Sequence, residues 1–443
     1  MCFSYGSRFN DDIACERCLF LGDRKILRAR NEDYAESILC CNIAYGSHYN
    51  NYGFYFIEDF ITCTVNILIA PNAFKNSLNA RQATRAIEQG LQLSNLECST
   101  TCFPIADGGD GTGSLIIDAC GGKVIWKEVH DPFGRKIDAS FGLIDNGKTA
   151  VIEMADASGL KLLKKEEYKP LRASSRGTGE LILFALDEGV EKIIIAMGGS
   201  ATVDGGCGIL RALGLRFLDD EDDEIEAVPE FLVDVEKIDS SLLDKRILNC
   251  EVIILCDVDS KLLGKKGAAE VFGPQKGAGP GDVIFLDFFL TNFADVTQAQ
   301  TGVDISDIKH SATAGGAAAG LHAWINAKLV NGIDNFLNIT NFQSALQNCD
   351  LLITGEGSLD VQTLQGKGPF GVAKKAKAKG IKVVGIAGKI PKNEDESLNQ
   401  YFDIMVPINN EVADLETAIE NTCVNLIRTA KMVGDLLALK LKC

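Results

Sequence analysis

Six glycine-rich segments of this sequence each combine glycines with a carboxylate, a hydroxyl group or a cation. They are IADGGDGTGS (105–114), SSRGTGELILFAL (174–186), AMGGSATVDGGCG (196–208), CDVDSKLLG (256–264), FGPQKGAG (272–279) and TGEGSLD (354–360). Glycines let a backbone approach an anion closely, and carboxylates can hold Mg²⁺ or polarise a hydroxyl group. One such loop alone is usually a tight turn with a capping side chain. Six strand-to-loop junctions of this kind favour an anionic substrate, a metal ion and a transferring phosphate.

A seventh segment, GLIDNGKTAVIEM (142–154), matches the Walker A pattern G-x-x-x-x-G-K-[ST]. A P-loop needs a helix directly after the pattern, so that the helix N-terminus meets the phosphates. Here a β-branched apolar run follows the pattern, and an alternating strand-like run precedes it. Asn146-Gly147 between two such runs is typical of a type I′ β-hairpin. We therefore interpret this segment as a hairpin and not as a P-loop.

The elements that carry these loops alternate between strands and helices. NILIAP (66–71) reads as a buried strand, and the helix after it has Asn79 as its predicted N-cap. Near the other end, DLLITGEGSLD, FGVAKKAKAKG and IKVVGIAGKI read as strand, helix and strand. We predict an α/β fold with two α/β domains around a cleft. A flavodoxin- or Rossmann-like domain would use both chain ends (66–125 and 296–443) for one parallel sheet, and 126–295 would form an inserted mixed α/β domain.

Residues 1–64 differ from the rest of the chain. They hold six of the 15 cysteines and show no sustained helical or strand period. Cys15-x-x-Cys18 suggests zinc, but the adjacent pair Cys40-Cys41 has poor spacing for metal ligands. We interpret this stretch as an atypical N-terminal extension that is either disordered or not native, with Val65 as an alternative start.

Composition excludes several classes of function. A formal net charge of −17 argues against nucleic-acid binding and against docking on an anionic membrane. No apolar run approaches the roughly 18 residues that span a bilayer, and the N-terminus lacks the apolar segment of a signal peptide. Four histidines leave little room for a His-rich metal site. We expect a cytoplasmic enzyme, either a monomer or a homodimer.

The glycine-rich loops, in this order, resemble the bacterial glycerate kinase family that uses no P-loop. The resemblance covers roughly residues 66–440 and is carried by IAPNAFKNSL, ADGGDGT, GTGELI, GGSATVDGG, CDVD, VFGPQKGA, AGGAAAGL and ITGEGSLD. It implies a phosphotransferase with an alcohol acceptor, which uses ATP and Mg²⁺ to phosphorylate D-glycerate. The same groups would serve either hydroxyl of glycerate, and the resemblance favours 2-phosphoglycerate as the product.

The resemblance also implies roles for individual residues. The proposed catalytic residues are Lys75, Asp107, Asp204 and Asp257, and the candidate Mg²⁺ ligands are Asp107, Asp110 and Asp257. The proposed substrate- or phosphate-binding residues are Ser77, Arg176, Gly198, Gly199, Ser200, Lys276, Thr354, Gly355, Glu356 and Gly357. The carboxylates would orient the acceptor hydroxyl or hold the metal, and the cations would stabilise the charge of the transferring phosphate.

Three departures from the family pattern support an alternative function. Asn72, Val203 and Ser358 stand where the family usually has Asp, Asn and Arg. A catalytically weakened member would bind glycerate or nucleotide as a sensor or partner without turnover. A Rossmann-type dehydrogenase is a poor alternative, because PNAFKNS and not G-x-G-x-x-G follows the first strand.

Overall fold

The structure of the chain is a computed structural model that describes residues 64–360, 363–364, 366–390, 396–409 and 414–440. The predicted N-terminal extension and its Cys15-x-x-Cys18 motif lie almost entirely outside the described residues, and the first strand begins at Val65. Within the described part of the chain, no helix is both long enough and apolar enough to cross a membrane.

One sheet of the molecule contains five parallel strands in the order β13-β12-β11-β1-β2. Their bounds are Val65–Ile69 (β1), Cys98–Cys102 (β2), Leu351–Ser358 (β11), Lys382–Lys389 (β12) and Ile404–Pro407 (β13). β1 pairs with β2 on one side and with β11 on the other, so the predicted parallel sheet is formed from both ends of the described chain. The strand order reverses between β1 and β11, which is where open α/β sheets bind ligands at the carboxyl ends of their strands.

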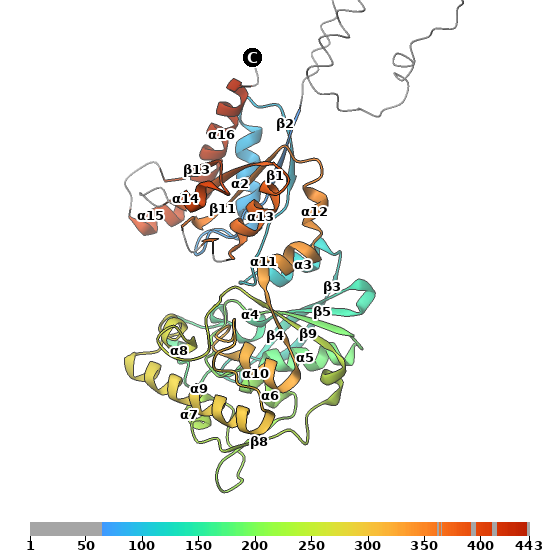
Figure 1. The fold of residues 1–443 in the computed structure, drawn as a ribbon, viewed down its shortest axis with the longest axis vertical. Coiled ribbons are helices and arrows are strands. Elements are labelled where there is room, and N and C mark those ends of the chain that lie inside the picture. Colours follow the sequence, from blue (N-terminus) through green and yellow to red (C-terminus); the bar gives the residue numbers. More distant parts are fainter. Residues whose placement is uncertain (1–63, 361–362, 365, 391–395, 410–413, 441–443) are drawn as a thin grey trace, which may run out of the picture. The chain divides into compact units, whose positions relative to one another are not determined.

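Helices cover both faces of this sheet (Figure 1). They are α2 (Ala80–Gln92), α13 (Gly368–Lys377), α14 (Glu396–Asn399), α15 (Leu415–Glu420) and α16 (Thr422–Lys440). The predicted N-cap Asn79 is confirmed: its side chain accepts from the backbone N–H of Gln82, and the Gln82 side-chain oxygen accepts from the backbone N–H of Asn79. α16 packs along α2 at Gly90, where a Cβ atom would lie 2.6 Å from that of Ala430.

The second sheet contains six strands in the order β10-β9-β6-β5-β4-β3. Their bounds are Lys123–His130 (β3), Lys136–Ile144 (β4), Thr149–Glu153 (β5), Lys192–Ala196 (β6), Glu251–Cys256 (β9) and Lys328–Asn331 (β10). β3, β4 and β5 are antiparallel to one another, whereas β5, β6, β9 and β10 run parallel. The predicted mixed α/β character of the middle of the chain agrees with this topology.

The remaining elements accompany the second sheet. The helices are α4 (Met154–Ser158), α5 (Arg176–Asp187), α6 (Cys207–Ala212), α7 (Pro229–Leu232), α8 (Ala268–Phe272), α9 (Pro280–Thr301) and α10 (Ala317–Ile325), and β7 (Arg216–Leu218) pairs with β8 (Lys237–Asp239). The six-stranded sheet extends beyond the predicted boundaries at 126 and 296, because β3 begins at Lys123 and β10 pairs with β9. We propose domain boundaries after residues 122 and 331 instead.

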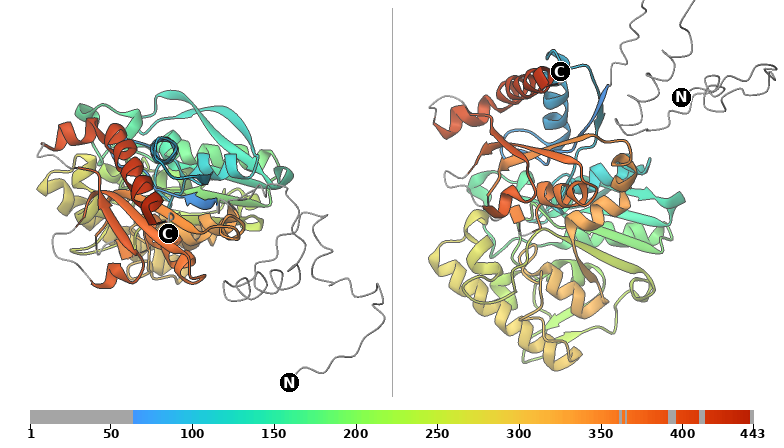
Figure 2. Two further views of the ribbon diagram at one scale, coloured as in Figure 1. Left: turned by 90° about the horizontal axis from the view of Figure 1, so that it is seen from above. Right: turned by 45° about the horizontal axis from the view of Figure 1, so that its top comes forward.

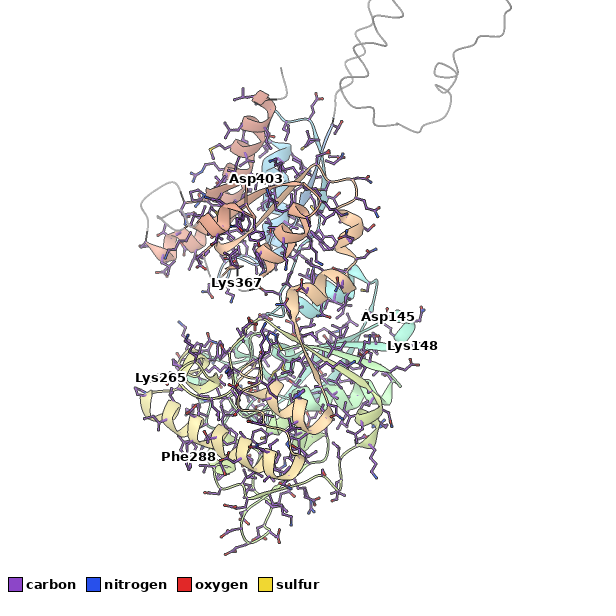
Figure 3. The ribbon with its side chains drawn as sticks, viewed as in Figure 1. Asp145, Lys148, Lys265, Phe288, Lys367 and Asp403 are labelled. Atoms are coloured by element: carbon purple, nitrogen blue, oxygen red, sulfur yellow. The ribbon has the colours of Figure 1, made fainter. Side chains whose placement is uncertain are left out.

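The Walker A match is a β-hairpin. β4 and β5 pair antiparallel up to Ile144 and Thr149, which leaves four residues in the connection. Asp145, Asn146 and Gly147 have φ values of 53°, 57° and 86°, so the connection is not the predicted two-residue type I′ turn. Lys148 Nζ bonds Glu191 Oε1 at 3.0 Å on the protein surface, at the outer tip of the hairpin (Figure 3). No helix follows the pattern in the manner of a P-loop.

Two helices join the sheets through a shared apolar cluster. α3 (Thr112–Ala119) and α11 (Gly332–Ile339) lie between the two sheets (Figures 1 and 2). The cluster takes side chains from both sheets and both helices, among them Leu68, Ile116, Val151, Ile194, Phe336 and Leu352. The short α12 (Phe342–Ala345) follows α11 and contributes Phe342. The loops at the carboxyl ends of the two sheets are therefore held on one packed body.

Candidate active site

The first part of the site is the point where the order of the parallel sheet reverses. Asn72 lies on the loop after β1, and its backbone N–H donates to the Gly355 carbonyl group of β11 at 2.9 Å. Glu356, the next residue of β11, is 8% exposed and accepts a hydrogen bond from the Thr363 hydroxyl group at 3.0 Å. Burial raises the pKa of Glu356 to about 7, against the opposing charge of Lys367. A carboxyl group whose pKa is close to neutral pH therefore lies at this edge of the sheet.

Asp107 lies on the loop after β2 and is held by donors from two other loops. Its Oδ2 atom accepts from Asn72 Nδ2 at 3.0 Å and from the Gly368 backbone N–H at 3.3 Å. Gly368 is the first residue of α13, where the helix dipole favours a negative charge. Among the described residues, no donor bonds the Oδ1 atom of Asp107, so this oxygen is available to a ligand.

The Asp107 loop also reaches the second sheet. Gly198, after β6, donates its N–H to the carbonyl oxygen of Gly108 at 3.0 Å. A Cβ atom on Gly108, whose φ is 105°, would lie 2.8 Å from the Leu255 carbonyl oxygen of β9. Only glycine fits this position, because a side chain would meet both the backbone of β9 and the strain of a positive φ. The loop thus connects the carboxyl edges of the two sheets.

Asp257 follows β9 at this meeting point. Burial is the main cause that raises its pKa, and the negative charge of Asp107 adds to the increase. Lys75 and Lys276 oppose the shift with their positive charges. Lys75 acts on Glu356 in the same way. We name Lys75, Asp107, Asp257, Glu356 and Lys367 the acid–lysine cluster.

Lys276 lies behind this cluster and is 3% exposed. Its Nζ atom donates to Ser200 Oγ at 2.9 Å and to the Thr202 carbonyl oxygen at 2.6 Å. Burial lowers the pKa of Lys276 to about 7, against the charges of Asp204 and Asp257. In this arrangement Lys276 fixes the loop after β6, and the predicted direct contact of its ammonium group with a phosphate stays a prediction.

The predicted phosphate cradle is closely packed against the Asp107 loop. A Cβ atom on Gly198 would lie 2.6 Å from the carbonyl carbon of Gly109 and 2.7 Å from the backbone nitrogen of Asp110. Gly199 has a φ of 73°, which favours glycine. Gly198, Gly199 and Ser200 therefore lie in one turn at the carboxyl edge, beside the acid–lysine cluster.

The geometry does not support Asp204 as a catalytic base. Its carboxylate is completely buried and accepts four hydrogen bonds. The donors are Ser175 N (2.8 Å), Ser175 Oγ (2.7 Å), Gly206 N (3.1 Å) and Gly208 N (3.3 Å). These bonds join the loop after β6 to the beginning of α5. Asp204 organises the loop and has no free oxygen for a substrate.

Three further predicted binding residues use their polar groups within the fold. The Ser77 hydroxyl group donates to the Ile419 carbonyl oxygen at 2.7 Å, which ties the loop after β1 to α15. The Thr354 hydroxyl group donates to the Ala70 carbonyl oxygen at 2.7 Å. Arg176 Nε bonds Glu180 on its own helix at 2.9 Å.

Gly355, Gly357 and Arg176, which were also predicted to bind substrate or phosphate, lie in three different environments. A Cβ atom on Gly355 would overlap the Ile386 carbonyl oxygen of β12, so Gly355 serves strand packing. Gly357 lies beside the backbone of Lys75: a Cβ atom placed on Gly357 would lie 3.8 Å from the Lys75 backbone nitrogen. Arg176 lines a separate cavity of about 390 Å³ with His130, Arg172 and Arg211.

The three candidate Mg²⁺ ligands do not come together in one group. Asp110 is engaged elsewhere: its carboxylate bonds Lys161 Nζ at 3.3 Å and shares a hydrogen bond with Glu153. Across the described residues, no three His, Cys, Asp or Glu side chains come together as a metal site. Mg²⁺ commonly takes one or two protein carboxylates and completes its shell with phosphate oxygens and water. Asp107 and Asp257 still fit that coordination.

Sequence reasoning did not assign Lys367, Thr363 or Glu153 to the site. Lys367 is the N-cap of α13 and lies at the edge of the five-stranded sheet's domain (Figure 3). The segment GKGP around it combines a cation with flanking glycines and a proline at the helix start, which was a usable signal. Glu153 ends an apolar strand, and nothing in its local sequence distinguishes it.

Carboxylates and lysines at the carboxyl edges of parallel strands, without a P-loop, suit an α/β phosphotransferase, and the comparisons with known proteins show a kinase. The chain belongs to the glycerate kinase family: the sequence model of that family matches residues 67–438. The fold class and the kinase activity predicted from sequence are confirmed.

Individual relatives agree with this assignment. A glycerate kinase from Bacillus subtilis (strain 168) is 42% identical over 370 residues, which cover 84% of this chain and 97% of the relative. The glycerate 2-kinase of Escherichia coli (strain K12) is 38% identical over 378 residues, which cover 85% and 99%. The crystal structure of a candidate glycerate kinase 2 from Salmonella typhimurium LT2 is similar with a TM-score of 0.72 and 39% identity, over 86% of this chain and all of that one.

Proposed function

We propose that this chain transfers the terminal phosphoryl group of ATP to the 2-hydroxyl group of D-glycerate. The proposal is supported by the acid–lysine cluster, in which the charges of Asp107, Lys75 and Lys367 act on the buried carboxyl groups of Asp257 and Glu356. The name of the Escherichia coli relative supports the 2-position. Phosphoryl transfer needs an oriented acceptor and cations around the phosphate more than it needs covalent chemistry.

Asp107 is the residue that we assign to the acceptor hydroxyl group. Its Oδ2 atom is fixed by Asn72 and Gly368, and Oδ1 is left to accept the hydroxyl proton. Lys75 and Lys367 would bind the carboxylate of glycerate or the charge on the transferring phosphate. The turn after Gly198 would present the backbone N–H groups of Gly199 and Ser200 to the nucleotide phosphates.

Mg²⁺ would be held by Asp257 together with phosphate oxygens, beside Asp107. The donor chemistry fits, because the charge of Asp107 already raises the pKa of Asp257, and a cation would relieve this repulsion. When bound, the ion would neutralise phosphate charge in the transition state.

The test is ADP formation by the purified full chain with ATP, Mg²⁺ and D-glycerate, against L-glycerate and a control without acceptor. Phosphorus–proton coupling in the NMR spectrum of the product identifies the phosphorylated hydroxyl group. Turnover specific to D-glycerate with phosphate on the 2-hydroxyl is the expected result. Binding of glycerate or ATP without turnover would contradict the proposal and favour the sensor alternative.

A further inference from the structure

A buried glutamate outside the acid–lysine cluster holds the loop that carries Asp107. Glu153 is the last residue of β5 and is 6% exposed. One of its carboxyl oxygens accepts the backbone N–H of Gly111, and the other accepts the N–H of Gly113 at 3.2 Å. Both donors belong to the turn where the Asp107 loop ends and α3 begins. A side chain of the second sheet thus holds a loop that starts in the first.

The fit around Glu153 leaves little freedom. A Cβ atom on Gly113 would lie 3.1 Å from Glu153 Oε2, so the backbone of α3 approaches the carboxyl group directly. Glu153 pairs in register with Ala196 of β6, which places it at the same carboxyl edge as the Gly198 turn. The loop that contains Asp107 is therefore fixed at its end by Glu153 and at its middle by Gly198.

Asp110 meets the same carboxyl group. The side chains of Asp110 and Glu153 are hydrogen-bonded, which requires one proton because two carboxylates offer no donor. Burial is the main cause that raises the pKa of Glu153 to about 8, and the bond to Asp110 adds to it. Burial also acts to raise the pKa of Asp110, but the bond to Glu153 and the charge of Lys161 lower it overall. The opposite directions of the two pKa shifts favour Glu153 over Asp110 as the holder of a shared proton.

We propose that Glu153 is a positioning residue of the phosphoryl-transfer site, which fixes the Asp107 carboxylate by binding Gly111, Gly113 and Asp110. This proposal rests on the role proposed for Asp107. Glu153 does not touch the acid–lysine cluster and acts only through the loop.

The arrangement predicts how two substitutions differ. Glu153→Gln keeps an oxygen for a backbone N–H and gains an amide that donates to Asp110, so it mimics the protonated glutamic acid. Glu153→Ala leaves the N–H groups of Gly111 and Gly113 without their acceptor. The charged groups that act on Glu153 are Asp110, Asp156 and Lys161.

The kinetic test compares wild type, Glu153→Gln and Glu153→Ala from about pH 6.5 to about 9.5, with the exposed Glu191→Gln as the control. We expect Glu153→Ala to lower kcat at least ~10-fold while either KM changes less than ~3-fold. Glu153→Gln should stay within ~3-fold of wild type at pH 7, because its amide keeps one acceptor and one donor toward the same partners. A kcat of Glu153→Ala within twofold of wild type, or a Glu153→Gln variant as impaired as Glu153→Ala, would overturn the proposal.

Amide hydrogen exchange at Gly111 and Gly113 separates this proposal from the proposed function, because it needs no turnover. Exchange should become at least ~10-fold faster in Glu153→Ala and stay unchanged in Asp107→Asn. Unchanged exchange in Glu153→Ala would overturn the positioning role even if the chain is a glycerate kinase. Faster exchange in a chain without kinase activity would leave the positioning of the loop intact and contradict only the proposed function.

Discussion

The two oxygens of Asp107 have different surroundings, and Asn72 is the reason. Its amide Nδ2 donates to Oδ2 of Asp107 at 3.0 Å, while its own oxygen accepts the Ala73 N–H at 2.8 Å. An aspartate at position 72 would place two carboxylates at that distance and would need a proton between them. Asn72, which motivated the sensor alternative, binds Asp107 without a shared proton and is therefore compatible with turnover.

Replacement of Asp107 tests its catalytic role at the residue scale. Asp107→Asn keeps the side-chain size but cannot accept the hydroxyl proton, so kcat/KM for D-glycerate should fall at least ~10-fold. The matched control is Asp138→Asn, which changes an exposed aspartate on β4. Steady-state kinetics measure both variants, and melting temperatures confirm that both are folded. A near wild-type rate in Asp107→Asn would place the site elsewhere.

Glu356 predicts a pH dependence of stability. Burial raises its pKa in the folded protein to about 7, so between about pH 4.5 and about 7 the folded chain keeps a proton that the unfolded chain releases. Stability contributed by protonated Glu356 is thus present at low pH and lost as pH rises through this window. Glu356→Gln should gain melting temperature relative to wild type from about pH 4.5 to about 7, and the difference should then level off. A constant difference across the window would contradict the expectation; Glu221→Gln, in the exposed loop, is the control.

At the scale of elements, local sequence predicted secondary structure better than it predicted side-chain partners. The strands, the N-cap Asn79 and the hairpin at 142–154 follow from apolar runs and turn residues that are neighbours in the chain. Contacts between residues far apart in the sequence were not predicted. Ser77 was predicted to bind an anion, yet its hydroxyl group donates to Ile419, and Asp204 accepts from Ser175 at the start of α5. No short-range pattern encodes such contacts, so the sequence predicts the loops better than it predicts the partners of their side chains.

The contact between the Gly198 turn and the Asp107 loop gives a prediction for these elements. Gly198→Ala would push a methyl group into the backbone of Gly109 and Asp110, which must move. We expect about 1–3 kcal/mol of lost stability from the overlap and a kcat at least ~10-fold lower. Gly281→Ala is the matched control, because open space surrounds that position in the first turn of α9. Chemical unfolding and kinetics measure both; equal effects of the two variants would show that the loop contact is unimportant.

At the scale of the whole molecule, the site depends on the packing between the sheets. Asp107 and Glu356 come from the five-stranded sheet, and Asp257 comes from the six-stranded one. Residues 62–443 form a single compact unit, and one apolar cluster includes side chains of both sheets. A kinase site divided in this way stays assembled only while that cluster is packed.

Ile116 of α3 tests whether the two sheets unfold together. It is completely buried in the shared cluster, so Ile116→Ala removes three carbons from a site packed between both sheets. We expect a loss of about 2–5 kcal/mol, with one calorimetric transition shifted to lower temperature as a whole. Leu439→Ala on the exposed side of α16 is the control and should shift the transition little. If Ile116→Ala instead splits the transition in two, the sheets fold independently. The acid–lysine cluster would then lie at an interface between separately folding domains. Its residues would lose their relative positions as soon as the less stable sheet unfolds.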